Sequence, residues 1–260
     1  MPEIARGGWP PARDTRAPVG LPRQAWLLAK NDLRQEMRDF ELVATAGFFT
    51  VVVLVMFGLS FATLDLDAQA IAIPGMLWLG VAFVGALTLT RIFDREREAD
   101  TLRALLCAPV DRLAIYIAKA GVTLLVLLGC CGILVPGLTL LFPGAAAFAD
   151  HPAQTFALVV LGCLSYAAVG TLFAAGLATS SGKNVLLSVI LYPLTSPALI
   201  FALVSTRALL ERHPDFDKYL SQLAALDVLV LVLSGWLFES VLVGTSARRG
   251  APTGGRRRRR

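Results

Sequence analysis

The chain has 260 residues, of which 56% are hydrophobic and only 17% are charged, and its mean hydropathy is +0.66. Soluble domains are about 45–50% apolar and about 25% charged, so this composition excludes a soluble globular domain, a disordered chain and a disulfide scaffold. It indicates an integral membrane protein. The net charge of +5 is typical of basic loops that set membrane orientation, and we expect no nucleic-acid partner.

The N-terminal part precedes any stretch long enough to cross a membrane. Residues 1–23 are expected to form a cytoplasmic extension, and the first 41 residues hold no apolar run that would predict a cleaved signal peptide. Residues 24–41 predict an amphipathic helix with one apolar stripe at three- and four-residue steps: Trp26, Ala29, Leu33, Met37 and Phe40. This helix would lie flat at the membrane interface or pack on the cytoplasmic ends of other helices.

Six apolar stretches follow, at residues 42–64, 68–90, 120–141, 156–179, 184–206 and about 224–245. A helix needs about 20 apolar residues to cross the hydrocarbon core, and the ten-residue alternating segments of a membrane barrel do not occur in the sequence. We therefore predict an all-α integral membrane protein whose six transmembrane helices form one domain at residues 24–246.

Basic residues predict the orientation of these helices. Of the 24 Lys and Arg residues, 21 lie before the first span, in the loops after the second and fourth spans, or in the C-terminal tail; three lie in the loop between the fifth and sixth spans. Because positive residues stay inside, both termini are expected in the cytoplasm. The polybasic tail, residues 247–260, is expected to contact anionic lipid.

The longest inner loop, residues 91–119, has a charged first half and an apolar second half. Glu96 and Glu98 belong to a charge-laced helix, and Leu105 and Leu106 form an apolar patch before Pro109, which ends the helix. Arg112 then precedes the third span. We interpret this segment as a coupling loop whose apolar tip docks into a groove on a partner; the alternative is a solvated connector.

The same loop carries a family resemblance. The string Glu96-x-Glu98-Ala99-Asp100-Thr101-Leu102-x-Ala104-Leu105-Leu106-x-Ala108-Pro109-x-x-Arg112, followed by Lys119, resembles the first intracellular loop of ABC-2-type permeases. Further matches to the CcmB family of cytochrome c maturation are Asn31-Asp32-Leu33-Arg34-x-Glu36, Arg91-x-Phe93-x-x-Glu96 and Pro193-x-x-x-Pro197-Ala198-Leu199-Ile200-Phe201. Asp100 departs from the glycine common there, and Trp236-Leu237-Phe238-Glu239 replaces a Pro-Phe-Ala-like run.

The resemblance implies an ABC-2-type architecture in a bacterial inner membrane and a division of labour. A separate ATP-binding subunit, CcmA, would drive a permease dimer that assembles with the haem-handling protein CcmC and the small protein CcmD. The complex would export haem or release the haem-loaded periplasmic chaperone CcmE. The alternatives are an ABC-2-type exporter of a drug or polysaccharide, a secondary transporter, and a membrane scaffold.

The sequence offers no catalytic, cofactor-binding or metal-binding motif of its own. The segment 176–184 has five residues between its glycines and ends in Asn184, so it does not match a phosphate-binding loop. We expect the chain not to be an enzyme, with ATP bound on the partner and haem a handled substrate. His151 and His213 are expected to be solvated outer residues, and Cys130 and Cys131 to be small apolar residues.

Polar and helix-breaking residues inside the spans are the remaining candidates. We expect Glu239 to be a buried, paired or protonated acid, with a role in the conformational cycle as the alternative, and Asp227 to lie near the outer headgroups. Pro193 and Pro197 predict a kink in the fifth span that is either a hinge or a fixed bend. Gly170, recurring with Ala174 and Ala178, predicts close helix packing.

Overall fold

The computed structural model describes residues 20–98, 111–178 and 184–249, and every regular element in these ranges is helical. The elements are α1 (Leu21–Asp39), α2 (Glu41–Phe61), α3 (Leu66–Glu98), α5 (Arg112–Leu141), the 3₁₀ helix η1 (Pro143–Ala145), α6 (Ala147–Asp150), α7 (Pro152–Ala178), α8 (Asn184–Leu210) and α9 (Phe216–Arg249). Six of them, namely α2, α3, α5, α7, α8 and α9, are long and apolar enough to cross a membrane. The prediction of six membrane-spanning helices is therefore confirmed for the described part of the chain.

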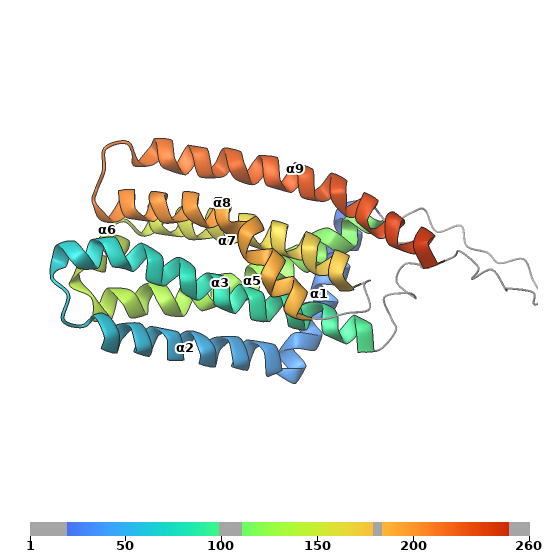
Figure 1. The fold of residues 1–260 in the computed structure, drawn as a ribbon, viewed down its shortest axis with the longest axis horizontal. Helices are drawn as coiled ribbons and strands as arrows, with labels where there is room; N and C mark the ends of the chain where they lie inside the picture. The colour runs from blue at the N-terminus through green and yellow to red at the C-terminus, as the bar shows by residue number, and fades with distance from the viewer. Residues whose placement is uncertain (1–19, 99–110, 179–183, 250–260) are drawn as a thin grey trace, which may run out of the picture.

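The six long helices run side by side, and their short connections place successive helices antiparallel (Figure 1). One end of the bundle carries α1, the C-terminal end of α3 and the N-terminal end of α5; we call it the α1 end. The opposite end carries η1 and α6, and we call it the α6 end. Phe40 separates α1 from α2 in the left-handed backbone region, with φ of 53°, so α1 leaves the direction of the spans and packs against α5.

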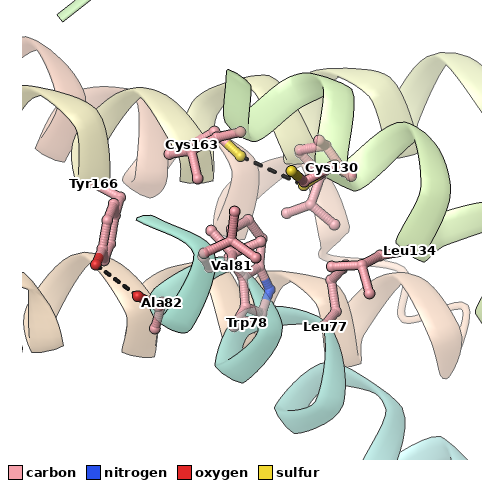
Figure 2. Packing of buried hydrophobic residues seen from close by; sticks show 14 of the residues in the cluster. Leu77, Trp78, Val81, Ala82, Cys130, Leu134, Cys163 and Tyr166 are labelled. Carbon is pink, nitrogen blue, oxygen red and sulfur yellow. Dashed lines mark hydrogen bonds between the residues drawn. The ribbon is translucent and has the colours of Figure 1, made fainter. Parts of the chain in front are cut away.

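The packed centre of the bundle is formed by α3 and α7. Within their apolar windows 61% and 67% of residues are buried, against 17% in both α2 and α9. Two aromatic rings of the centre lie on glycines of the neighbouring helix: a Cβ added to Gly162 would meet Trp78 at 2.0 Å, and one added to Gly85 would meet Tyr166 at 2.1 Å. Figure 2 shows Trp78 in this core and the Tyr166 hydroxyl on the carbonyl of Ala82.

The glycine on the small-residue strip of α7 also allows close packing. A Cβ on Gly170 would lie 2.3 Å from Leu89 of α3, so the helix approach predicted for this position is confirmed. Glycine lets two helices approach closely because no side chain stands between them.

The sixth span begins earlier than the hydropathy pattern suggested. α9 starts at Phe216, eight residues before the expected 224, because Asp217 and Lys218 occupy its first turn instead of a loop. This shift moves Asp227 from the expected headgroup depth into the helix interior. The prediction that Asp227 is interfacial is wrong, and its side chain is only 2% exposed.

Candidate functional site

The coupling loop predicted from the sequence joins α3 to α5 at the α1 end. Leu105, Leu106 and Pro109 lie outside the described residues. Glu96 and Glu98 belong to the last turn of α3 and Arg112 is the first residue of α5, but their side chains lie outside the described part as well. Their docking roles stay predictions, whereas the surroundings of the loop are described in detail.

Three polar contacts anchor the start of α5 to α1. The Asp111 carboxylate caps α5 by accepting from the Leu113 N–H at 3.0 Å, and the Asp111 N–H donates to Gln24 Oε1, also at 3.0 Å. One turn further into the bundle, Lys119 Nζ lies 2.8 Å from Asp32 Oδ2. We call Gln24, Asp32, Asp111 and Lys119 the α1–α5 clamp.

The ion pair of the clamp is largely withdrawn from water. The side chain of Lys119 is 9% exposed and that of Asp32 is 25% exposed, so neither charge is fully solvated and each depends on the other. Breaking such a pair costs far more than breaking a surface pair, which contributes about 0–1 kcal/mol. The clamp therefore fixes the position at which the coupling loop enters α5.

The face that α1 presents to α5 differs from the predicted stripe. Ala25 is the buried residue of α1, whereas Trp26 is 67% exposed and Leu27 is 53% exposed. The stripe assigned Trp26 to the packed side because tryptophan is strongly apolar. An amphipathic ring at the end of a membrane bundle instead suits the interface between headgroups and water.

A second ion pair joins the ends of α2 and α3 near the loop. Arg91 Nη1 lies 2.5 Å from Glu41 Oε1, and both side chains are more than half exposed. An exposed pair of this kind adds little stability. It does place Arg91, the first residue of the predicted coupling loop, against the start of α2.

Two buried hydrogen bonds join the centre of the bundle at residues that the sequence analysis did not single out. Trp78 Nε1 donates to Thr206 Oγ1 at 2.7 Å and connects α3 to α8. Tyr116 Oη donates to the carbonyl of Ala168 at 3.2 Å and connects α5 to α7. No short-range pattern reveals such pairs, because the partners are 128 and 52 residues apart.

Two intramembrane contacts involve residues that the sequence did single out, apart from their partners. Asp227 of α9 accepts a hydrogen bond from the Ser165 hydroxyl of α7. Cys131 Sγ of α5 lies 3.6 Å from Cys163 Sγ of α7, so the two thiols touch although no C-x-x-C motif joins them. All three cysteines among the described residues are free and buried.

The fifth span compensates for one of its prolines locally. Pro197 has no N–H, which removes the helical donor for the carbonyl of Pro193. The Ser196 hydroxyl donates to that carbonyl at 2.7 Å and restores the lost hydrogen bond. Figure 1 shows α8 changing direction along its length, whereas the choice between a hinge and a fixed bend stays open. Glu239 lies in α9, with its side chain outside the described residues.

Comparisons with known proteins agree with this architecture. The family model described as CcmB protein matches residues 23–243. The chain belongs to the CcmB family. Heme exporter protein B of Bradyrhizobium diazoefficiens is 31% identical over 219 residues, which cover 79% of this chain and 91% of the relative. Heme exporter protein B of Escherichia coli K12 is 29% identical over 204 residues, covering 77% of this chain and 89% of the relative.

The CcmB match includes both halves of the clamp, since it begins before Gln24 and extends past Lys119 into α9. It also places Asp32 and Lys119 in different parts of the family region, although the fold brings them together. The pair is the clearest polar feature that the one-dimensional pattern concealed.

At the α6 end, the two histidines of this CcmB chain lie beside one ion pair. Asp150 and Arg212 form a salt bridge between α6 and the turn after α8, and each precedes a histidine. His151 and His213 are both exposed, and the solvated location predicted for them is confirmed. His213 Nδ1 accepts from the Asp215 N–H at 3.1 Å, so the neutral ring carries its proton on Nε2. Among the described residues no group of three or more metal-ligating side chains occurs.

Proposed function

We propose that this chain is the membrane permease subunit of an ABC transporter complex for cytochrome c biogenesis. The complex exports haem or uses ATP energy to release the haem-loaded periplasmic chaperone CcmE. A separate ATP-binding subunit, CcmA, supplies the energy, and CcmC and CcmD complete the assembly. Two copies of the permease work as a dimer in the bacterial inner membrane, with both termini in the cytoplasm.

The observation that carries this proposal is the CcmB match over residues 23–243, which takes in all six membrane-spanning helices. The names of the relatives, heme exporter protein B, give the process. The positive-inside pattern supports a cytoplasmic α1 end, because 21 of 24 basic residues belong to segments at that end. An ATP-binding partner would then meet the bundle at the coupling loop.

The clamp supports a specific way of passing force from that partner into the membrane. A push on the coupling loop would reach α5 at Asp111, where the helix is capped and also held by Gln24 of α1. The Asp32–Lys119 pair would make α1 and α5 move together, since separating the two charges is costly in a site this dry. In this mechanism the chain itself transmits movement and performs no bond-making step.

Complementation tests the proposed function. The chain is expressed in a bacterium that lacks its own heme exporter protein B, and c-type cytochromes are measured by haem staining. The proposal predicts restored c-type cytochromes, while b-type cytochromes, which need no maturation system, stay unchanged. Failure to restore them, with the chain present in the membrane and its matching ATP-binding subunit co-expressed, would contradict the proposal.

A further inference from the structure

The contact between Asp227 and Ser165 lies deep in the bundle, away from both ends. Asp227 is 11 residues beyond Phe216, the start of α9, and Ser165 is 13 residues beyond Pro152, the start of α7. At 1.5 Å per residue these positions are about 16 Å and about 20 Å from the α6 end. The hydrocarbon core is about 30 Å thick, so both side chains lie near its middle.

The Asp227 carboxyl group has one hydrogen-bond partner where an ionised carboxylate needs several. The side chain is 2% exposed and Ser165 is 0% exposed. Asp227 Oδ1 is bonded to the Ser165 hydroxyl, while Oδ2 is buried without a hydrogen-bond partner in the described structure. An ionised carboxylate can accept at about four lone-pair sites, and a buried charge left this poorly solvated is neutralised instead.

The ionisable groups around Asp227 offer no compensating positive charge. The helices packed against α9 are α5, α7 and α8. Their described charged or titratable side chains are Tyr116, Lys119, Cys130, Cys131, Cys163, Tyr166 and Arg207, and α9 itself adds Asp217, Lys218 and Tyr219 near its start. Cys163, with Cys130 and Cys131 behind it, is the ionisable group within electrostatic range of Asp227, and it can supply no positive charge.

The basic residues of this set are engaged elsewhere. Lys119 pairs with Asp32 at the α1 end, Arg207 pairs with Glu211 at the α6 end, and Lys218 pairs with Asp215. No ion pair in the described ranges reaches Asp227. A neutral carboxylic acid fits the geometry, because its O–H donates to the Ser165 hydroxyl and only a carbonyl oxygen is left without a partner.

We propose that Asp227 and Ser165 form a proton-binding site between α7 and α9. The carboxyl group holds a proton while the two helices are packed together and releases it when they separate and water enters. The released proton goes to water, and the resulting carboxylate is then hydrated. This site goes beyond the proposed function, and it requires no assumption about which cargo the complex carries.

Carbodiimide labelling of the full-length chain in lipid vesicles tests the proposal. Dicyclohexylcarbodiimide is apolar and adds to protonated carboxyl groups to give a stable N-acylurea, with no leaving group. A water-soluble carbodiimide reaches exposed carboxyl groups such as Asp217. The modified residue is located by peptide mass spectrometry, and Asp227→Asn is the matched variant because it keeps the size and hydrogen bonding of the acid.

The expected result is an adduct on Asp227 with the apolar reagent that decreases as the pH rises and is lost completely in Asp227→Asn. The water-soluble reagent should label Asp217 and leave Asp227 unmodified. Asp227→Asn should elute as the wild type does in gel filtration, since it resembles the protonated acid. Absence of the apolar adduct at every pH in folded protein would overturn the proposal.

Two further outcomes would also overturn it. Equal labelling of Asp227 and Asp217 by the water-soluble reagent would show a hydrated carboxylate. Protection of Asp227 by sodium chloride, but not by choline chloride at the same pH, would show a metal-cation site instead of a proton site. Complementation can succeed or fail independently of each labelling result, so the two proposals are tested separately.

Discussion

The Asp32–Lys119 pair makes the most quantitative prediction about how α1 is attached to the bundle. Asp32→Leu leaves the ammonium group of Lys119 in a site where its side chain is only 9% exposed. Removing one partner of a fully buried pair costs about 3–5 kcal/mol. Because the Asp32 side chain is 25% exposed and the lysine stem can bend toward water, we expect a loss of about 2 kcal/mol.

The reverse change, Lys119→Met, removes the more deeply buried charge and leaves a partly hydrated carboxylate, so we expect it to cost about 1 kcal/mol. The double variant Asp32→Leu/Lys119→Met contains no stranded charge and should be more stable than Asp32→Leu alone. The coupling energy of the cycle should be about 1–2 kcal/mol, which is within the range for residues in direct contact.

The measurement is the free energy of unfolding in detergent micelles for the wild type, the two single variants and the double variant. Arg91→Met, which breaks the exposed pair with Glu41, serves as the matched control and should cost about 0–1 kcal/mol. Additive single losses, or an Asp32→Leu loss no larger than that of Arg91→Met, would refute the reasoning that the clamp holds α1 on α5.

Three further predictions concern the membrane-embedded part. Gly162→Ala should cost about 1–3 kcal/mol of stability, because its Cβ would lie 2.0 Å from Trp78, whereas Gly129→Ala, which meets nothing within 4 Å, should be tolerated; equal melting temperatures would contradict this. Thr206→Val leaves the buried indole N–H of Trp78 without its acceptor and should cost about 1–3 kcal/mol, while Thr206→Ser should unfold like the wild type. Glu239→Gln should keep assembly and Glu239→Leu should destabilise the chain; normal assembly of both variants with loss of function would show that Glu239 acts in the cycle.

The six spans were predictable because each is an apolar run whose length matches the hydrocarbon core. The start of α9 was not, since Asp217 and Lys218 mark a loop in any hydropathy window although they can occupy the exposed first turn of a helix. The depth assigned to Asp227 inherited that error. The correct assignment required the packing of α9 on α7.

Contacts between distant segments could not be predicted from one sequence. Asp32 and Lys119 were both singled out through the family resemblance, yet nothing in their local patterns joins them. The Cys131–Cys163 contact was missed because cysteine spacing reports pairs within one segment, whereas these thiols come from two helices. The coupling loop was found because it combines charge, an apolar patch and a proline in one continuous stretch.

The central claim is that a separate ATP-binding subunit drives this chain through the coupling loop. It is tested most directly by co-purification of that subunit with tagged wild type, Leu106→Asp and the control Arg248→Ala, after confirming equal membrane insertion. Leu106→Asp buries an unpaired charge at the docking tip and should cost about 2 kcal/mol or more, which is a loss of affinity of about thirtyfold. The account predicts that Leu106→Asp loses the ATP-binding subunit while Arg248→Ala keeps it. Retention of the subunit by Leu106→Asp at the wild-type level would contradict it.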